Sequence, residues 1–143
     1  MRFGITSDLL CLRTLEPGEA ARVARLVVQR VRGIDERSLI AHLEQFSEGQ
    51  ILAFDSKNKL VGWALHLRVS KAAQGSMQRL GTPSLAMHDS MGELLLPFET
   101  ETPLSAAGAG LREALNAARQ SLVAALGLAQ VLKGVSVRNP QVA

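Results

Sequence analysis

The sequence predicts an α+β domain in which helices flank a mixed sheet of about five strands. Short apolar runs bounded by turn residues recur along the chain, two helical apolar stripes come early in it, and one long apolar-striped helix comes late. The chain has 143 residues, of which 47% are hydrophobic and 20% charged, so one domain with its own core is expected over residues 1–143. The expected order is strand–helix–helix–strand–strand–strand–helix–strand.

The first strand is expected at residues 9–15, and the first helix directly after it. Glu16-Pro17-Gly18-Glu19 places proline and acidic residues where first turns favour them, and Gly33 is a suitable stop. A second helix is expected from near Asp35 to Phe46. Each helix has an apolar stripe, which consists of Ala20, Ala24, Val27, Val28 and Val31 in the first and of Leu39, Ile40, Leu43 and Phe46 in the second.

Two strands are expected at residues 51–54 and 60–69, joined by the hairpin turn Ser56-Lys57-Asn58-Lys59. Residues 71–91 show no clear periodicity and are expected to form a long, partly disordered loop. A fourth strand follows Gly92. The third helix is expected at residues 111–126, with Gly127 at its C-terminus, and the last strand at residues 131–137.

A turn of small residues, Ala106-Ala107-Gly108-Ala109-Gly110, is expected between the fourth strand and the third helix. Glycines let the backbone bend tightly and turn its free N–H groups outward. Together with the positive end of the helix dipole, these donors can hold a phosphate or a pyrophosphate. No Lys-Ser or Lys-Thr pair follows, so the turn is not a P-loop.

From His88 onward the sequence resembles the GNAT acyltransferases, which hold the pyrophosphate of acetyl-CoA on such a turn. Similar family members read His, Asp, two variable residues and Gly, as in His88-Asp89-Ser90-Met91-Gly92, and then have a strand with one carboxylate, here Glu99. Residues 107–112 correspond to the phosphate loop, and residues 46–50 and 59–64 are similar to the family's second and third strands. The resemblance covers most of the chain.

This resemblance implies transfer of an acyl group from acetyl-CoA or another acyl-CoA to an amine. In the family, the donor to the thioester oxygen is commonly a backbone N–H of the fourth strand, where Phe98 is expected to contact the cofactor. The pyrophosphate would lie against the start of the third helix. The residues implied there are Gly108, Ala109, Gly110, Leu111 and Arg112.

The resemblance also places a general base at Glu99 and a substrate contact at His88. An amine must lose a proton when it attacks a thioester, and a carboxylate on the fourth strand can take it. Strand alternation puts Glu93, Glu99 and Glu101 on one face. The alternative is that these glutamates simply face solvent.

Three departures from the family pattern favour a different function, a non-catalytic GNAT-like module that scaffolds an assembly or dimerises. The phosphate loop has Ala107 where the family has Arg or Gln, and Arg112 where it has Gly or Ala, although Arg112 can compensate by its charge. The chain has no tyrosine, the usual acid for the leaving thiolate. Pro97 lies within the fourth strand, where it removes an N–H donor and favours a bulge or an edge.

Family members usually continue with another helix and two more strands beyond the point that this sequence reaches. We therefore expect either a shortened domain or strands supplied by a partner. An uncovered last strand would leave backbone groups unpaired. The prediction is a homodimer or larger assembly with a partner strand against or near residues 131–137.

Composition argues against several other functions. Arginines on the first expected helix contribute to a formal charge of +3, but aromatic residues make up only 3%, so a solvated face is favoured over a nucleic-acid surface. No apolar run approaches the roughly 20 residues of a membrane span. The arginines in question are Arg22, Arg25, Arg30 and Arg32.

Cysteine and histidine usage indicates neither a disulfide nor a metal site. The single cysteine, Cys11, cannot form an internal disulfide, which fits a cytoplasmic protein, and it is expected to be an inert core residue rather than a reactive thiol. His42 is expected to be structural or at the surface, and His66 to be structural. No spacing among these residues and His88 suggests zinc ligation.

Overall fold

The computed structural model describes residues 1–6, 9–74, 85–102 and 107–133, and its centre is one six-stranded sheet. Strand order follows the chain, and all neighbours are antiparallel except the last pair, which is parallel. The α+β class is therefore confirmed. The strands are β1 (Arg2–Ile5), β2 (Cys11–Thr14), β3 (Ile51–Phe54), β4 (Leu60–Val69), β5 (Leu94–Glu101) and β6 (Gln130–Val131).

Strand β1 is the one strand of the six that was not expected from the sequence. Three of its four residues are exposed, and Gly4 adopts a positive φ of 95° within it. Such a segment has no buried face and so no alternation of apolar and polar residues. Cys11, in the neighbouring β2, is a free cysteine of intermediate burial rather than a fully buried one.

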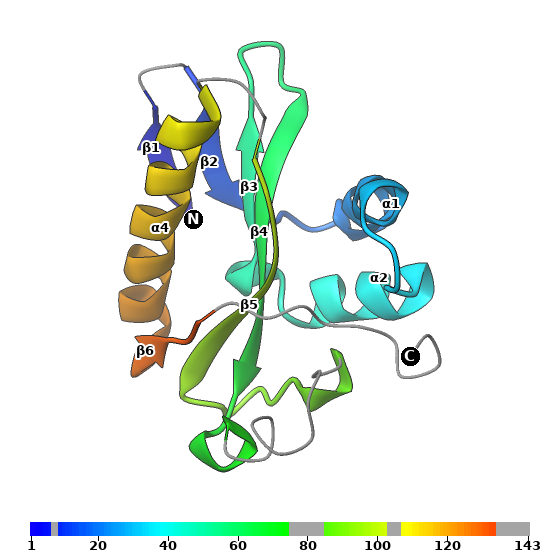
Figure 1. Cartoon of the computed structure of the whole chain (residues 1–143), viewed down its shortest axis with the longest axis vertical. Coiled ribbons are helices and arrows are strands. Elements are labelled where there is room, and N and C mark those ends of the chain that lie inside the picture. The colour runs from blue at the N-terminus through cyan, green and yellow to red at the C-terminus, as the bar shows by residue number, and fades with distance from the viewer. Residues whose placement is uncertain (7–8, 75–84, 103–106, 134–143) are drawn as a thin grey trace.

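Helices cover both faces of the sheet (Figure 1). Helices α1 (Ala20–Arg30) and α2 (Glu36–Gln45) lie on one face, and α4 (Ala107–Leu126) lies on the other. Alternating side chains of each strand supply the two cores, so that Leu65 and Leu96 face α1 and α2, whereas Leu95 faces α4. The short helices η1 (Ser47–Gly49) and η2 (Leu85–Met87) complete the described elements that position the site.

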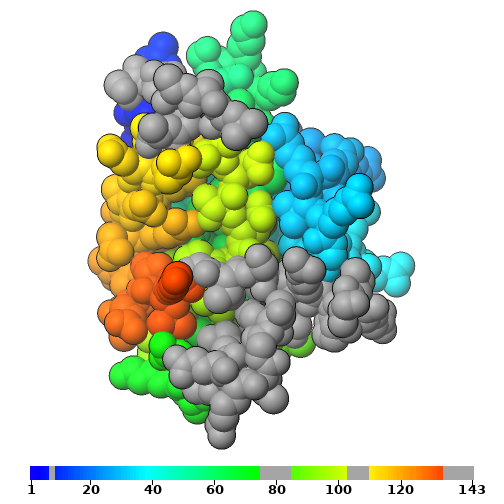
Figure 2. Space-filling model, in the orientation of Figure 1, coloured from blue at the N-terminus to red at the C-terminus, as the bar shows by residue number. Residues whose placement is uncertain are grey.

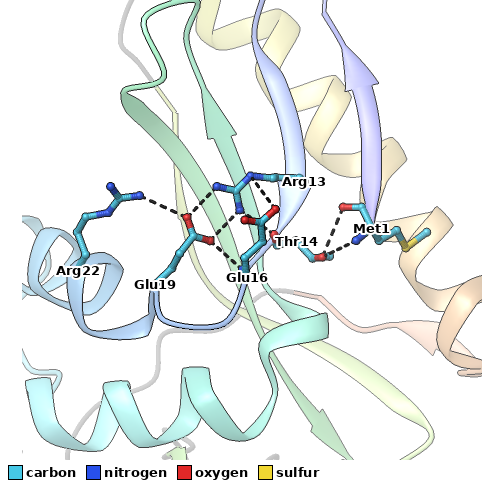
Figure 3. Close-up of polar contacts among 6 residues, drawn as sticks. All are labelled: Met1, Arg13, Thr14, Glu16, Glu19 and Arg22. Atoms are coloured by element: carbon cyan, nitrogen blue, oxygen red, sulfur yellow. Dashed lines mark hydrogen bonds and ion pairs between the residues drawn. The ribbon is translucent and has the colours of Figure 1, made fainter.

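A polar cluster fixes the start of α1 to the sheet (Figure 3). Both terminal nitrogens of Arg13 donate to the Glu19 carboxylate at 2.7 Å, and the Glu16 N–H donates to the same carboxylate at 2.8 Å. The hydrogen bond from Arg13 holds the pKa of Glu19 below its usual value. Arg22 also reaches Glu19, at 3.3 Å, so the arginines of this helix form surface ion pairs, in line with the expected solvated face.

Helix α4 begins at Ala107 rather than at residue 111, so the expected turn of small residues is wrong for residues 107–110, which form the first turn of this helix. Ala106 lies outside the described residues. Glycine is unfavourable in a helix by up to about 1 kcal/mol relative to alanine, but packing overrides this preference. Leu111 is completely buried against Gly62, where a built Cβ would lie 2.7 Å from the leucine side chain.

Two further boundaries differ from the expectations. The last strand is Gln130–Val131, and residues 134–137 of the expected strand lie outside the described residues. Within the expected loop at residues 71–91, residues 71–74 and 85–87 are helical, and residues 75–84 are outside the description. Gly92 closes this segment against the backbone of Val69, where a built Cβ would lie 2.6 Å from a carbonyl carbon.

Candidate functional site

Strand β5 contains a bulge at the position where the sequence predicted one. Leu65 pairs with Glu99 and His66 with Pro97, so Phe98 has no partner residue on β4. Proline cannot donate to the ladder, and an extra residue in one strand is left unpaired. The backbone of Phe98 is thereby taken out of the regular ladder, as a donor to a ligand requires, while its side chain is buried on the face of α2.

Beyond this bulge the described part of β6 no longer pairs with β5, and we refer to this region as the opening between β5 and β6. The two strands pair only at Leu94 with Gln130 and at Leu95 with Val131, and the Leu132 N–H donates to the Leu95 carbonyl oxygen at 2.8 Å. Within the described part of the chain, residues 97–101 of β5 therefore have a neighbouring strand on the β4 side only. Figure 2 shows atoms of β5 at the surface, between those of α4 and those of α1.

Glu99 lies on the α1 side of this opened segment. Its Oε2 accepts a hydrogen bond of 3.0 Å from Nε1 of Trp63, which is only 2% exposed. Burial raises the pKa of the Glu99 carboxyl, against the opposing effect of the Trp63 hydrogen bond. Among the described residues no Lys or Arg lies within ion-pair distance of Glu99, whereas Arg30 pairs with Glu101 at 3.1 Å. A half-buried carboxyl with a raised pKa and no ion-pair partner is a candidate proton acceptor.

The bulge also changes which glutamates share a face. Glu99 and Glu101 both face the α1 side, as their contacts to Trp63 and Arg30 show. Glu93 precedes the strand, and its alternation follows that of Leu95, which packs against α4. The expectation that all three glutamates lie together is wrong for Glu93, because one extra residue reverses the alternation.

His66 is a neutral ring fixed at both nitrogens. Its Nδ1 lies 2.6 Å from the carbonyl oxygen of Gly49, which can only accept, so Nδ1 carries the proton. Its Nε2 then accepts a hydrogen bond of 3.0 Å from Nε of Arg119. Burial, with a smaller effect of the Arg119 charge, lowers the pKa of His66 to about 3. The ring therefore stays neutral at physiological pH.

Arg119 projects from α4 toward β5 and completes this arrangement. Its Nη1 donates to Asn116 Oδ1 and its Nη2 to Thr100 Oγ1. It lines a cavity of about 310 Å³ in the opening of the sheet. The lining comes from β5, α4 and the segment of β6, and consists of Pro97, Thr100, Asn116, Arg119, Gln120, Val131 and Leu132.

His88 lies on the other face of the sheet, against α2. Its Nδ1 accepts the Arg68 N–H at 3.1 Å, and its ring lies 4.9 Å from the rings of both His42 and Phe46. His42 is buried, and its Nε2 lies 2.8 Å from the carbonyl oxygen of His66. These contacts give His88 a structural role. A substrate contact remains a prediction.

Residues 108–112, which were predicted to hold a pyrophosphate, all lie in the first two turns of α4. Leu111 is buried in the core, while Gly110 and Arg112 are exposed. The first four N–H groups of a helix have no partner within it, so the donors available at this end belong to residues up to about 109. Residues 103–106, which precede them, lie outside the description.

Four residues of this candidate site were not expected from the sequence, namely Trp63, Thr100, Asn116 and Arg119. One signal was available, since His66 interrupts an apolar strand and Arg119 interrupts an apolar helix. Their pairing across the sheet depends on register, which the sequence does not show. Over the described residues, no group of His, Cys, Asp and Glu could hold a metal ion, and no helix has the length and apolar character of a membrane span.

No protein-family model and no curated protein matches this sequence. Solved structures match its fold. The loading GNATL domain of CurA from Lyngbya majuscula has a TM-score of 0.56 at 13% identity, with 78% of this chain and 57% of that chain covered. The GphF GNAT-like decarboxylase in complex with isobutyryl-CoA has a TM-score of 0.55 at 18% identity, with 76% and 58% covered. This chain thus spans less than three-fifths of either protein, and the likeness shows a shared GNAT-like fold.

Proposed function

We propose that this GNAT-like domain binds an acyl-CoA in the opening between β5 and β6 and transfers the acyl group to an amine. One observation carries the proposal. The bulge takes Phe98 out of the ladder next to the end of the described β5–β6 pairing, and Glu99 lies beside it with a raised pKa and, among the described residues, no Lys or Arg within ion-pair distance. GphF, which shares the fold, has been solved with an acyl-CoA bound. The acceptor amine is a primary or secondary amine of unspecified class.

In the proposed reaction the amine nitrogen attacks the carbonyl carbon of the thioester. Glu99 takes the proton of the amine as the new N–C bond forms. The backbone N–H of Phe98 donates to the carbonyl oxygen as negative charge develops there. The C–S bond then breaks, and CoA leaves as a thiolate that takes a proton from water, because the chain has no tyrosine to supply one.

The pyrophosphate of the acyl-CoA is proposed to lie at the start of α4. Backbone N–H groups of Gly108, Ala109 and neighbouring residues would donate to it, and the exposed Arg112 would add a positive charge. Glycine at position 110 keeps this end of the helix free of side-chain bulk. His88 is proposed to contact the acceptor from the α2 side.

Calorimetry with acetyl-CoA and with CoA tests the proposal. We expect binding of both ligands by the unmodified protein and its loss in Gly110→Val, because a branched side chain at the helix start would exclude the pyrophosphate. Ala125→Val is the matched control, since it adds the same branched side chain to an exposed position at the far end of α4. Undetectable binding of both ligands at millimolar concentration would refute acyl transfer and favour the scaffold.

A second reaction is favoured by one comparison, the description of GphF as a decarboxylase. In that reaction the bond between the acyl α-carbon and a free carboxylate breaks, CO₂ leaves, and the resulting enolate takes a proton while the thioester stays intact. Mass spectrometry after incubation with malonyl-CoA in the absence of an amine distinguishes the two reactions. Formation of acetyl-CoA would indicate decarboxylation, and intact malonyl-CoA would favour transfer.

The predicted assembly through residues 131–137 remains a proposal. Of these residues, 131–133 are described, and Val131 is the one that belongs to a strand there. Light scattering across micromolar concentrations is expected to report a dimer or larger species. A monomer at all concentrations would contradict it.

A further inference from the structure

Arg119, a half-buried cation that lines the cavity, has hydrogen-bond partners of one kind only. A guanidinium has five N–H donors. Three of them are used in hydrogen bonds to His66, Asn116 and Thr100, which leaves one N–H on each terminal nitrogen without a partner among the described residues. All three partners are uncharged, and none of the ion pairs of the described residues includes Arg119.

A half-buried cation without a counter-charge is stabilised when an anion reaches it. Burying a charge without a counter-charge is unfavourable, and burial lowers the pKa of Arg119, which shows the direction of that cost. His66 is completely buried and can only accept at Nε2, so it holds the guanidinium in one orientation without neutralising it. A planar guanidinium with N–H groups left on both terminal nitrogens can donate to the oxygens of a carboxylate.

We infer that Arg119 binds a free carboxylate on the acyl group of the acyl-CoA, so that the domain prefers dicarboxylic acyl-CoA thioesters to simple fatty ones. The inference rests on the proposed function. It follows from the place of Arg119 in the cavity of about 310 Å³ beside Pro97 and Thr100, where the sheet opens next to the bulge.

The position of Arg119 along α4 separates it from the proposed phosphate site. Arg119 lies nine residues after Gly110, which at about 1.5 Å per residue places it roughly 14 Å farther along the helix. In an acyl-CoA the pantetheine arm lies between the pyrophosphate and the thioester. An anion at Arg119 therefore belongs to the acyl end of the ligand if the pyrophosphate is at the start of α4.

Two pairs of thioesters with matched chain length test the inference by calorimetry. Succinyl-CoA differs from butyryl-CoA, and malonyl-CoA from propionyl-CoA, by a carboxylate in place of a terminal methyl group. We expect tighter binding of the carboxylate in at least one pair, by about 10- to 150-fold for a charge-assisted contact. Arg119→Met should abolish that preference and leave the affinity for the uncharged partner within about twofold.

Arg119→Lys and Arg37→Met complete the set of variants. Lysine keeps the charge but cannot present two parallel donors, so an intermediate preference is expected. Arg37 is exposed on α2, on the other face of the sheet, and its replacement removes one charge without affecting the preference. Urea unfolding of each variant verifies that it is folded.

Each other outcome has a distinct meaning. Equal binding within both pairs by the unmodified protein overturns the inference but leaves the proposed function intact. A preference that survives in Arg119→Met also overturns it. Equal weakening of all thioesters and of free CoA in Arg119→Met places Arg119 against a phosphate of CoA instead. Absence of binding by any CoA ligand refutes the proposed function together with this inference.

Discussion

The two halves of β5 are built on opposite principles. Leu94–Leu96 is apolar, is buried to 1% exposure or less, and has pairing partners on β4, with β6 alongside its start. Residues 97–101 contain a proline, a bulge and three polar side chains, and the described strands pair them on one side only. The first half is built for stability and the second departs from local rules, as functional sites often do. Mutations in the two halves should therefore separate stability from activity.

The largest expected effect concerns the opened half. Glu99→Gln should lower turnover by roughly 10²–10⁴-fold, the range for loss of a general base, with acyl-CoA affinity unchanged. Turnover of the unmodified protein should rise with pH through the raised pKa of Glu99, since only the ionised carboxylate can take a proton. Steady-state kinetics over a pH series measures both. Equal turnover of the two proteins at every pH would remove Glu99 from the mechanism.

The paired half should show the reverse pattern. Leu96→Ala should lower the free energy of unfolding by about 2–5 kcal/mol, because it leaves a cavity in the core beneath α1 and α2. Leu96→Met, which nearly conserves volume, should cost less than about 1.5 kcal/mol. Urea unfolding and calorimetry with acetyl-CoA would measure stability and binding separately. A loss of affinity in Leu96→Ala under conditions where it is folded would show that the two halves are not independent.

Acid should weaken the buried polar core where the two halves of β5 meet. Burial lowers the pKa of His42 to about 4 and of His66 to about 3, and Nδ1 of His42 has no hydrogen-bond partner among the described residues. As the pH decreases, these histidines take up protons in the unfolded chain at a higher pH than in the folded protein. The free energy of unfolding is therefore highest above about pH 6.5 and decreases below it. Between pH 7.5 and pH 5, each of the two histidines should lower the free energy of unfolding by about 2 kcal/mol.

Urea unfolding at these two pH values measures the effect. His42→Gln should reduce the difference in the free energy of unfolding between the two pH values by the contribution of one histidine. Ser56→Ala, a control at an exposed position without a titrating group, should leave that difference unchanged. A stability that is independent of pH over this range would mean that the buried rings do not resist protonation.

The smallest effect again concerns Glu99. The pKa of Glu99 is raised in the folded protein, so the folded protein binds this proton more tightly than the unfolded chain does. The carboxyl therefore destabilises the fold once the pH exceeds the ordinary pKa of a glutamate. Glu99→Gln should therefore make the protein slightly more stable at pH 7, and the gain should vanish at pH 4. The same substitution would then abolish most activity and improve stability. A less stable variant at pH 7 would contradict this.

The sequence predicted the fold class well because most elements carry strong local signals. Helices α1 and α2 and strands β3 and β4 lie within one or a few residues of their expected bounds, since their apolar periodicity matches what they bury. Strand β1 has no such signal, and the start of α4 was misplaced because Gly108 and Gly110 read as a turn until Leu111 is seen packed over Gly62.

The site was predictable only in part. Glu99 and Phe98 could be named from the family resemblance, and Pro97 indicated the bulge. Arg119 could not be found in this way, because its role depends on the His66 tautomer and on the register that brings Thr100 to the same place. Such contacts join residues 19 to 53 positions apart, which no local pattern encodes.

Over the described residues, β5 beyond Leu96 has no neighbouring strand on its β6 side, and such an edge has a consequence for aggregation. A strand with unpaired backbone groups is a template on which foreign strands add, and repeated addition leads to aggregates. Pro97 lacks one donor of that template, and the bulge at Phe98 breaks the regular spacing of the others. A ligand that needs one backbone N–H donor can still bind at this edge. An added strand needs the N–H of every second residue, so it would pair poorly here. We therefore expect Pro97 to protect this edge against aggregation.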